Sequence, residues 1–299
     1  MIAFDIVLTL GLLACAAMAL TLRDRTASIA AFVVAGLLIA LSWVRLAAPD
    51  VALAEAAIGA GVTGALFLRS ARRIGPITGG PVGGMSASIA AALGAGGLSA
   101  ALFWAFAGTS GPVPYPPLVA ANLEASGVTN PVTAVLLNFR AWDTLLEIAV
   151  LAVALALVVM LGPAPVVPRA LGELVLPFAR IVVPLAILVA GHLLWQGATA
   201  PGGAFQAGAV LAGGMLALVL AGIGPAGERI VRGALLLGLA GLAVFVGAAL
   251  AAEGLTGRFL GYPAGAEKAW IIAIEASLTL SIAATLCLLF TGPVRRPHQ

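Results

Sequence analysis

The chain has 299 residues, of which 62% are hydrophobic and only 9% are charged. Its mean hydropathy of +1.14 lies far above that of soluble globular domains. The formal net charge is +3, and the arginines gather at the ends of apolar segments, which argues against nucleic-acid binding. These features predict an all-α, polytopic integral membrane protein.

The cysteines and histidines are too few and too scattered to suggest a metal or redox centre. Cys15 and Cys287 both lie in apolar segments, so neither a disulfide framework nor a cysteine metal site is expected. His192 and His298 are the two histidines, and the second is in the tail, which argues against a bis-histidine haem. We therefore expect no cofactor and no metal. The start of the chain lacks a basic n-region, so we interpret it as a retained first span.

Apolar stretches of about 20 residues recur along the chain, and this length suffices to cross a bilayer as a helix. We predict about nine spans, at residues 2–21, 27–47, 50–68, 87–107, 141–161, 177–196, 205–223, 231–252 and 269–291. Two Gly/Pro-rich stretches and a polar loop over 108–130 interrupt them. The predicted modules are 1–74 with three helices, 87–162 with two and 163–299 with four, and 75–86 forms a linker.

Arginines mark alternate connections between the predicted spans. The marked connections contain Arg23, Arg25, Arg69, Arg72, Arg73, Arg169, Arg229, Arg232, Arg295 and Arg296. The positive-inside rule then predicts an N-terminus outside and a C-terminus in the cytoplasm, which an odd number of spans permits.

Four ionisable residues lie within the apolar stretches: Glu55, Glu147, His192 and Glu275. A charge at the centre of a membrane helix costs about 2.5 to 3.5 kcal/mol, so each position is by default a functional hypothesis. The predicted topology places all four toward the outer half of the membrane. Their chemistry suits the binding and passage of a proton or cation. The alternative is that the acids are protonated and only bonded to neighbouring helices.

The third predicted span opens with Pro49-Asp50, and Asp50 either caps the helix or supports the site. Glu55 lies one turn deeper and has no capping role. Small residues recur beside it every four positions, which predicts close helix packing. They are Ala52, Ala56, Ala60 and Gly64.

Arg140, Asp143 and Glu147 are spaced so that one helix face carries all three. The apolar run from Val132 to Leu161 is too long for one span, so we expect a bend near Ala141-Trp142. We expect Arg140 and Asp143 to form an ion pair. Glu147 lies deeper, and desolvation suits a carboxyl group to reversible protonation.

His192 precedes a glycine-rich turn that opens the seventh predicted span. The turn comprises Pro201, Gly202, Gly203, Phe205 and Gln206. Histidine suits a proton relay, and such a turn exposes backbone amides, although a packing corner explains it equally well. The chain has no Ser/His/Asp set and no P-loop, so we expect no enzymatic activity of its own. It also has no mid-span lysine, which favours a subunit of a larger assembly.

Three pieces of the chain resemble the Mrp-type multisubunit cation/proton antiporters and the related membrane arms of energy-converting hydrogenases. Ala48–Gly61 resembles the MbhD-like C-terminal extension of the large A subunit, and Asn138–Ile148 resembles its MbhE-like piece. Gly191-His192 with Pro201–Gly208 resembles the B-subunit (MnhB-like) signature. Two positions depart from the family pattern: Ala204 stands in place of a third glycine, and Glu275 in place of an aspartate.

The resemblance implies a natural fusion of the A-subunit tail with the B subunit, in a bacterial or archaeal inner membrane. It implies a membrane subunit of an Mrp-like Na⁺/proton antiporter complex, in which Glu55 and Glu147 match the family's acids. Other membrane subunits, including a large antiporter-like one, are the expected partners. The alternatives are the same module in a hydrogenase-like or other redox-driven ion-pumping complex, and a passive scaffold subunit.

Overall fold

The computed structural model describes residues 2–73, 85–108, 115–160, 172–223 and 228–292, and this part is helical with no β-strand. The α-helices are α1 (Ile2–Thr21), α2 (Arg25–Arg45), α3 (Pro49–Ala54), α4 (Thr63–Arg73), α5 (Met85–Ala107), α6 (Tyr115–Asn122), α7 (Pro131–Ala134), α8 (Ala141–Met160), α9 (Val175–Gln196), α10 (Ala204–Leu220), α11 (Glu228–Thr256) and α12 (Glu267–Thr291). Two π-helical segments, η1 (Glu55–Val62) and η3 (Val135–Phe139), and the 3-10 turn η2 (Glu124–Ser126) complete the described part. The predicted all-α class is confirmed.

Several residues named in the sequence predictions lie outside this part. They are the Gly/Pro-rich stretches 75–84 and 162–168, positions 109–114 of the polar loop, Arg169, Arg295, Arg296 and His298. Within the described remainder of that loop, α6 and η2 are short helices.

Eight helices of the described part are long and apolar enough to span a membrane, and the chain is a multi-pass membrane protein. The shorter apolar helix α10 occupies the place of the seventh predicted span, which extended to residue 223. The helix ends earlier than predicted because Gly222, with φ of 80°, closes a Schellman motif. The Ile223 amide donates to the Leu218 carbonyl at 3.0 Å, and the Gly222 amide donates to the Val219 carbonyl at 3.1 Å.

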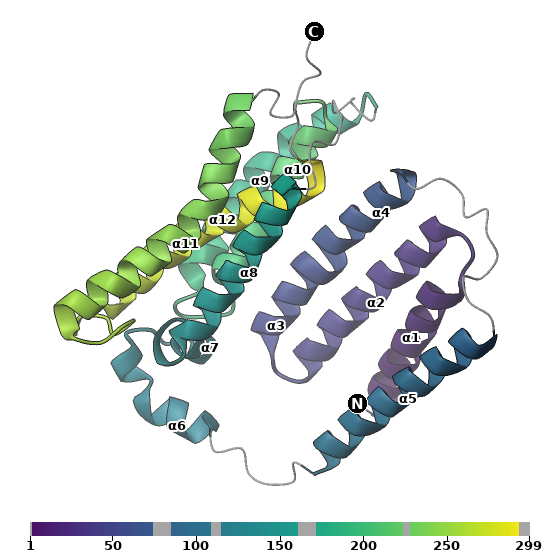
Figure 1. Ribbon diagram of the computed structural model, residues 1–299, viewed down its shortest axis with the longest axis horizontal. Helices are drawn as coiled ribbons and strands as arrows, with labels where there is room; N and C mark the ends of the chain where they lie inside the picture. Colours follow the sequence, from purple (N-terminus) through teal and green to yellow (C-terminus); the bar gives the residue numbers. More distant parts are fainter. Residues whose placement is uncertain (1, 74–84, 109–114, 161–171, 224–227, 293–299) are drawn as a thin grey trace.

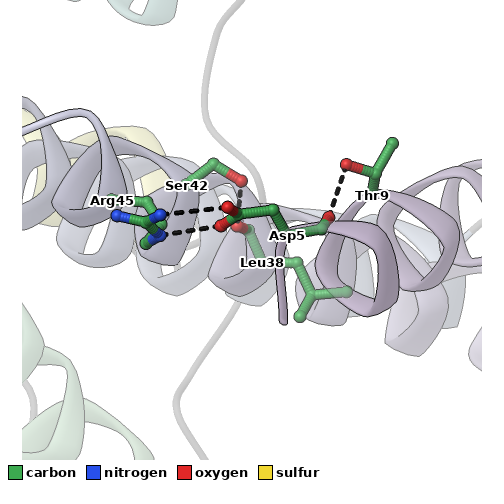
Figure 2. A network of polar contacts seen from close by, with 5 residues as sticks. All are labelled: Asp5, Thr9, Leu38, Ser42 and Arg45. Atoms are coloured by element: carbon green, nitrogen blue, oxygen red, sulfur yellow. Dashed lines mark hydrogen bonds and ion pairs between the residues drawn. The ribbon is translucent and has the colours of Figure 1, made fainter. Parts of the chain in front are cut away.

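The first group of helices is a row formed by α1, α2 and the continuous helix of α3, η1 and α4 (Figure 1). Between the first turn of α1 and the last turn of α2, the Arg45 guanidinium donates to both Asp5 carboxyl oxygens, at 2.7 and 3.0 Å (Figure 2). The Thr9 hydroxyl donates to the Asp5 carbonyl at 2.8 Å. The start of α1 is thereby fastened to the end of α2.

The predicted small-residue stripe packs against α2. Ala52 and Ala60 are buried, and a Cβ added at Gly36 of α2 would lie 3.1 Å from the Ala60 Cβ. Such proximity requires small side chains on both helices. Since η1 has π geometry, its backbone is wider than an α-helix, and the Thr63 hydroxyl donates to the Ile58 carbonyl five residues back at 2.8 Å.

The second group contains α8 to α12 (Figure 1). Among the helices long enough to span a membrane, α12 is the most buried. It contacts α8, α9, α10 and α11. Close approach to α11 depends on Gly241, where an added Cβ would lie 2.5 Å from the Ser281 Cβ, and the Ser281 hydroxyl donates to the Gly238 carbonyl at 2.5 Å. Phe245 of α11 and Ile274 and Leu278 of α12 belong to the main apolar core.

Two contacts join the groups near opposite ends of the third span. One is the buried polar junction around Asp50. At the other end, Arg69 of α4 stacks 4.8 Å over the Phe290 ring and donates to the Thr291 carbonyl at 3.1 Å. Between these two ends, segment η1 also contacts α10. Helix α5, by contrast, runs at one edge of the molecule and buries none of its residues (Figure 1).

The predicted bend before α8 is confirmed. The short helix α7 and segment η3 end at Arg140, whose φ of −132° and ψ of 41° interrupt the helical path. Helix α8 then starts at Ala141. The Thr144 hydroxyl donates across the bend to the Leu136 carbonyl at 2.7 Å. The bend thus has a side-chain support as well as a backbone break.

Candidate functional site

Three carboxyl groups from separate parts of the chain line one cavity of about 330 Å³. Asp50 comes from α3, Glu147 from α8 and Glu275 from α12. Each lies in the first half of its helix, and the turn before α10 forms another part of the wall. The rest of the lining is mostly apolar, with Thr133, Thr144 and Gln206 as further polar side chains. Electrostatic interactions are stronger in such surroundings than in water.

Asp50 is buried, with 9% of its surface exposed, and its carboxyl group bonds to segments far along the chain. Its Oδ1 accepts from the Gly202 amide at 3.2 Å and from Asn130 Nδ2 at 3.4 Å. Its backbone carbonyl accepts from Gln206 Nε2 at 3.1 Å. No side-chain cap bond is found at the start of α3, so Asp50 bonds to the turn before α10 instead.

The predicted turn is a tight corner and also a wall of the cavity. Gln196 Nε2 donates to the Pro201 carbonyl at 2.7 Å, and the Gly203 amide donates to the Leu193 carbonyl at 2.9 Å. Gly203 has φ of 109°, a conformation that favours glycine. A Cβ there would lie 2.9 Å from Glu275 Oε1. The same backbone therefore forms a packing corner between α9 and α10 and a wall of the cavity.

Glu275 is the most deeply buried of the three acids, with 3% of its surface exposed. Its carboxyl group lies beside Gly203, the N-cap residue of α10, and so faces the positive end of that helix. Its Oε2 has no hydrogen-bond partner among the described residues. A buried carboxyl oxygen without a partner is costly, which marks the position as more than packing.

Glu147 lines the cavity from α8 and is exposed. The expected ion pair one turn earlier is present: Arg140 Nη2 lies 2.8 Å from Asp143 Oδ2. Arg140 thus has a carboxylate partner other than Glu147. No ion pair involves Glu147 in the described part of the chain.

Glu55 and His192 do not line the cavity. The Glu55 carboxyl group lies back against its own helix, over Gly59, where an added Cβ would collide with it. Neighbouring residues Ala54 and Ile58 do reach the cavity wall. His192 is exposed on α9, next to Leu193, whose carbonyl holds the turn. The structure therefore assembles two of the four intramembrane groups, together with Asp50.

Sequence reasoning missed Asn130, which is 3% exposed. Its Nδ2 donates to the carbonyls of Gly197 at 3.1 Å and Ala200 at 3.0 Å, besides Asp50. The Thr133 hydroxyl donates to the same Gly197 carbonyl at 2.6 Å. The available signal was Asn130-Pro131, a helix cap followed by proline at the first helical position. That signal marks the start of α7 but does not reveal the distant partners.

The described residues contain no group of three or more His, Cys, Asp or Glu side chains arranged to hold a metal ion.

Two family models match the chain. Residues 10–76 match the MbhD family, which represents the D subunit of MBH, and residues 174–293 match the domain related to the MnhB subunit of the Na⁺/H⁺ antiporter. The first match contains Asp50 and Glu55, and the second contains His192, the turn and Glu275. The MbhE-like resemblance around Glu147 lies between the two and stays a prediction.

Among solved structures, the chain is similar to a chain of the Mrp complex from Dietzia sp. DQ12-45-1b, with a TM-score of 0.78 and 23% identity. The similarity covers 98% of this chain but 35% of the other, so this chain spans about a third of the length of the protein it matches. No curated protein matches. The chain therefore joins an MbhD-like region and a region related to the MnhB subunit of the Na⁺/H⁺ antiporter in one polypeptide.

Proposed function

We propose that the chain is a membrane subunit of an Mrp-like Na⁺/proton antiporter complex, and that Glu147 and Glu275 take up and release the exchanged ions. The observation that carries this proposal is the convergence of carboxyl groups from distant parts of the chain on one largely apolar cavity. Intramembrane acids that face a cavity are typical of ion pathways. The similarity of residues 174–293 to the domain related to the MnhB subunit of the Na⁺/H⁺ antiporter supports sodium and protons as the ions.

The two acids are suited to successive steps. Glu147 is exposed and without an ion pair in the described part, so an ion can reach it first. Glu275 is buried beside the start of α10, with one oxygen without a partner. A proton or a cation can satisfy that oxygen, but not both at once. This competition for one carboxyl group is the chemical basis of exchange.

Asp50 supports the site by holding the turn, and Glu55 and His192 belong to the pathway beyond the cavity. The predicted topology, with the N-terminus outside, puts the beginnings of α3, α8 and α12 in the outer half of the inner membrane. Other membrane subunits, including a large antiporter-like one, would supply the rest of the route.

The test replaces Glu147 and Glu275 singly by glutamine in the assembled complex, reconstituted in vesicles. Each variant should assemble and lose Na⁺-dependent proton exchange. Glu253→Gln serves as the matched control, because Glu253 is exposed on α11 and does not line the cavity. Normal exchange in both cavity variants would refute the transport role. Loss of assembly with normal exchange in the remaining complexes would favour a scaffold.

The rival redox-driven complex is separated by identifying the partners. Purification of the native complex should yield antiporter-type membrane subunits. Recovery of catalytic hydrogenase subunits would instead assign the chain to a redox-driven pump.

A further inference from the structure

The buried junction around Asn130 joins three distant segments of the chain. Asn130 precedes α7, Asp50 begins the third span, and Gly197 and Ala200 belong to the corner between α9 and α10. Its Nδ2 lies within 3.0 to 3.4 Å of acceptors in two of these segments. The backbone amide of Asn130 also donates to the Ala198 carbonyl at 3.1 Å.

These bonds exceed what a helix cap needs. For capping, Asn130 Oδ1 accepts from the Val132 amide at 2.9 Å, which satisfies one free amide at the start of α7. The Nδ2 group takes no part in that cap. An asparagine amide nitrogen offers two hydrogens, and here both are directed at the corner and at Asp50. The side chain therefore has a second task, which is to hold the corner.

The corner is connected to Glu275 within a few residues. Asp50 Oδ1 accepts from the Gly202 amide, and Gly203 follows, where an added Cβ would lie 2.9 Å from Glu275 Oε1. A shift of the corner by about 0.5 Å would stretch the 3.0 Å and 3.2 Å bonds to about 3.5 Å and 3.7 Å, at the limit of hydrogen-bonding range or beyond it. It would also move the start of α10 relative to Glu275.

We infer that Asn130 is a positioning residue of the ion site. Together with Asp50 it fixes the corner of residues 197–203, and the corner in turn fixes the Gly203 backbone beside the Glu275 carboxyl group. Asn130 does not line the cavity and does not bind the ion itself. This inference rests on the proposed function, because it assigns Asn130 its effect through the ion site at Glu275.

The primary test is Asn130→Ser in the reconstituted complex. Serine keeps the helix cap but is too short to reach Gly197, Ala200 and Asp50 together. We expect normal assembly, a rise of about tenfold in the Na⁺ concentration for half-maximal exchange and a change in maximal rate of less than about threefold. The matched control is Asn122→Ser, because Asn122 is exposed on α6 and bonds within its own helix.

A double variant tests whether Asn130→Ser changes the Na⁺ dependence of exchange by displacing the corner. Gly203→Ala disturbs the corner where it meets Glu275. If Asn130 acts through the same corner, Asn130→Ser adds little to Gly203→Ala, because residues of one network are not additive. If the two effects multiply, Asn130 acts separately and the inference is wrong.

The failures of the two proposals are distinguishable. If Glu275→Gln exchanges normally, the proposed function fails whatever Asn130 does. If Glu275→Gln abolishes exchange while Asn130→Ser leaves the Na⁺ dependence unchanged, only the positioning role fails. Loss of assembly in both Asn130→Ser and Asn130→Asp, which also keeps the cap, would make Asn130 a folding residue and overturn the inference.

Discussion

Replacing Gly203 by alanine tests how closely the turn must approach the cavity acid. The new Cβ would lie 2.9 Å from Glu275 Oε1, closer than such atoms normally come, and the residue has φ of 109°. With ψ of −175° besides this φ, the backbone conformation of Gly203 is essentially restricted to glycine and costs about 1 to 3 kcal/mol for a residue with a side chain. Turning the Glu275 carboxyl group away from the new Cβ adds about 0.5 to 1.5 kcal/mol. We therefore expect a destabilisation of about 1.5 to 4.5 kcal/mol, with exchange that requires a higher Na⁺ concentration.

Gly257 provides a control with positive φ at which an added side chain meets no neighbour. It also has positive φ, at 73°, and an added Cβ would meet nothing within 4 Å. Gly257→Ala should therefore lose only about 1 to 2 kcal/mol and keep its exchange activity. The assay compares thermal unfolding of the purified complexes and their Na⁺-dependent proton exchange in vesicles. Equal behaviour of the two variants would refute the claimed contact between the turn and Glu275.

Three further predictions concern other parts of the fold. Ser281→Ala removes the 2.5 Å bond to Gly238 and should lower the free energy of unfolding by about 1 to 3 kcal/mol, measured by chemical denaturation; an unchanged value would show that this bond does not hold α11 to α12. Asp143→Asn breaks a largely exposed ion pair and should change stability by less than about 1 kcal/mol, with exchange retained; loss of exchange would place Asp143 in the pathway. For the topology, cysteine at Ala47 should react with an impermeant reagent from outside and cysteine at Arg23 should not, and the reverse pattern would invert the predicted orientation.

Features set by local pattern could be predicted from the sequence. Hydropathy over about 20 residues locates membrane helices because the bilayer core fixes their length. The small-residue stripe predicts packing because only small side chains let two helices meet, as Ala60 and Gly36 do. The ion pair of Arg140 with Asp143 follows from helical spacing, and the bend at Arg140 follows from the excess length of the apolar run.

Features set by an unusual backbone conformation or by distant contacts could not be predicted. The early end of α10 depends on the positive φ of Gly222, which looks in the sequence like one more small residue in an apolar run. The position of Glu55 depends on η1, where π geometry changes which residues share a face. The role of Asn130 arises from partners about 70 residues away, at Gly197 and Ala200.

The cavity could be predicted only in part. Predicted topology placed Glu147 and Glu275 at a similar depth, because both occur early in helices that run in the same direction. It could not show that they line the same cavity, since depth does not fix which helices are neighbours. That arrangement follows from the packing of α8 and α10 against α12.

The most direct measurement is proton release when Na⁺ is added to the purified complex in weakly buffered detergent solution. We predict that the complex carrying the wild-type chain releases protons in a saturable manner, because Na⁺ displaces them from the cavity acids. The double variant Glu147→Gln with Glu275→Gln should not release them, and Glu253→Gln should behave as the wild type. Equal proton release from all three would contradict ion exchange at this cavity.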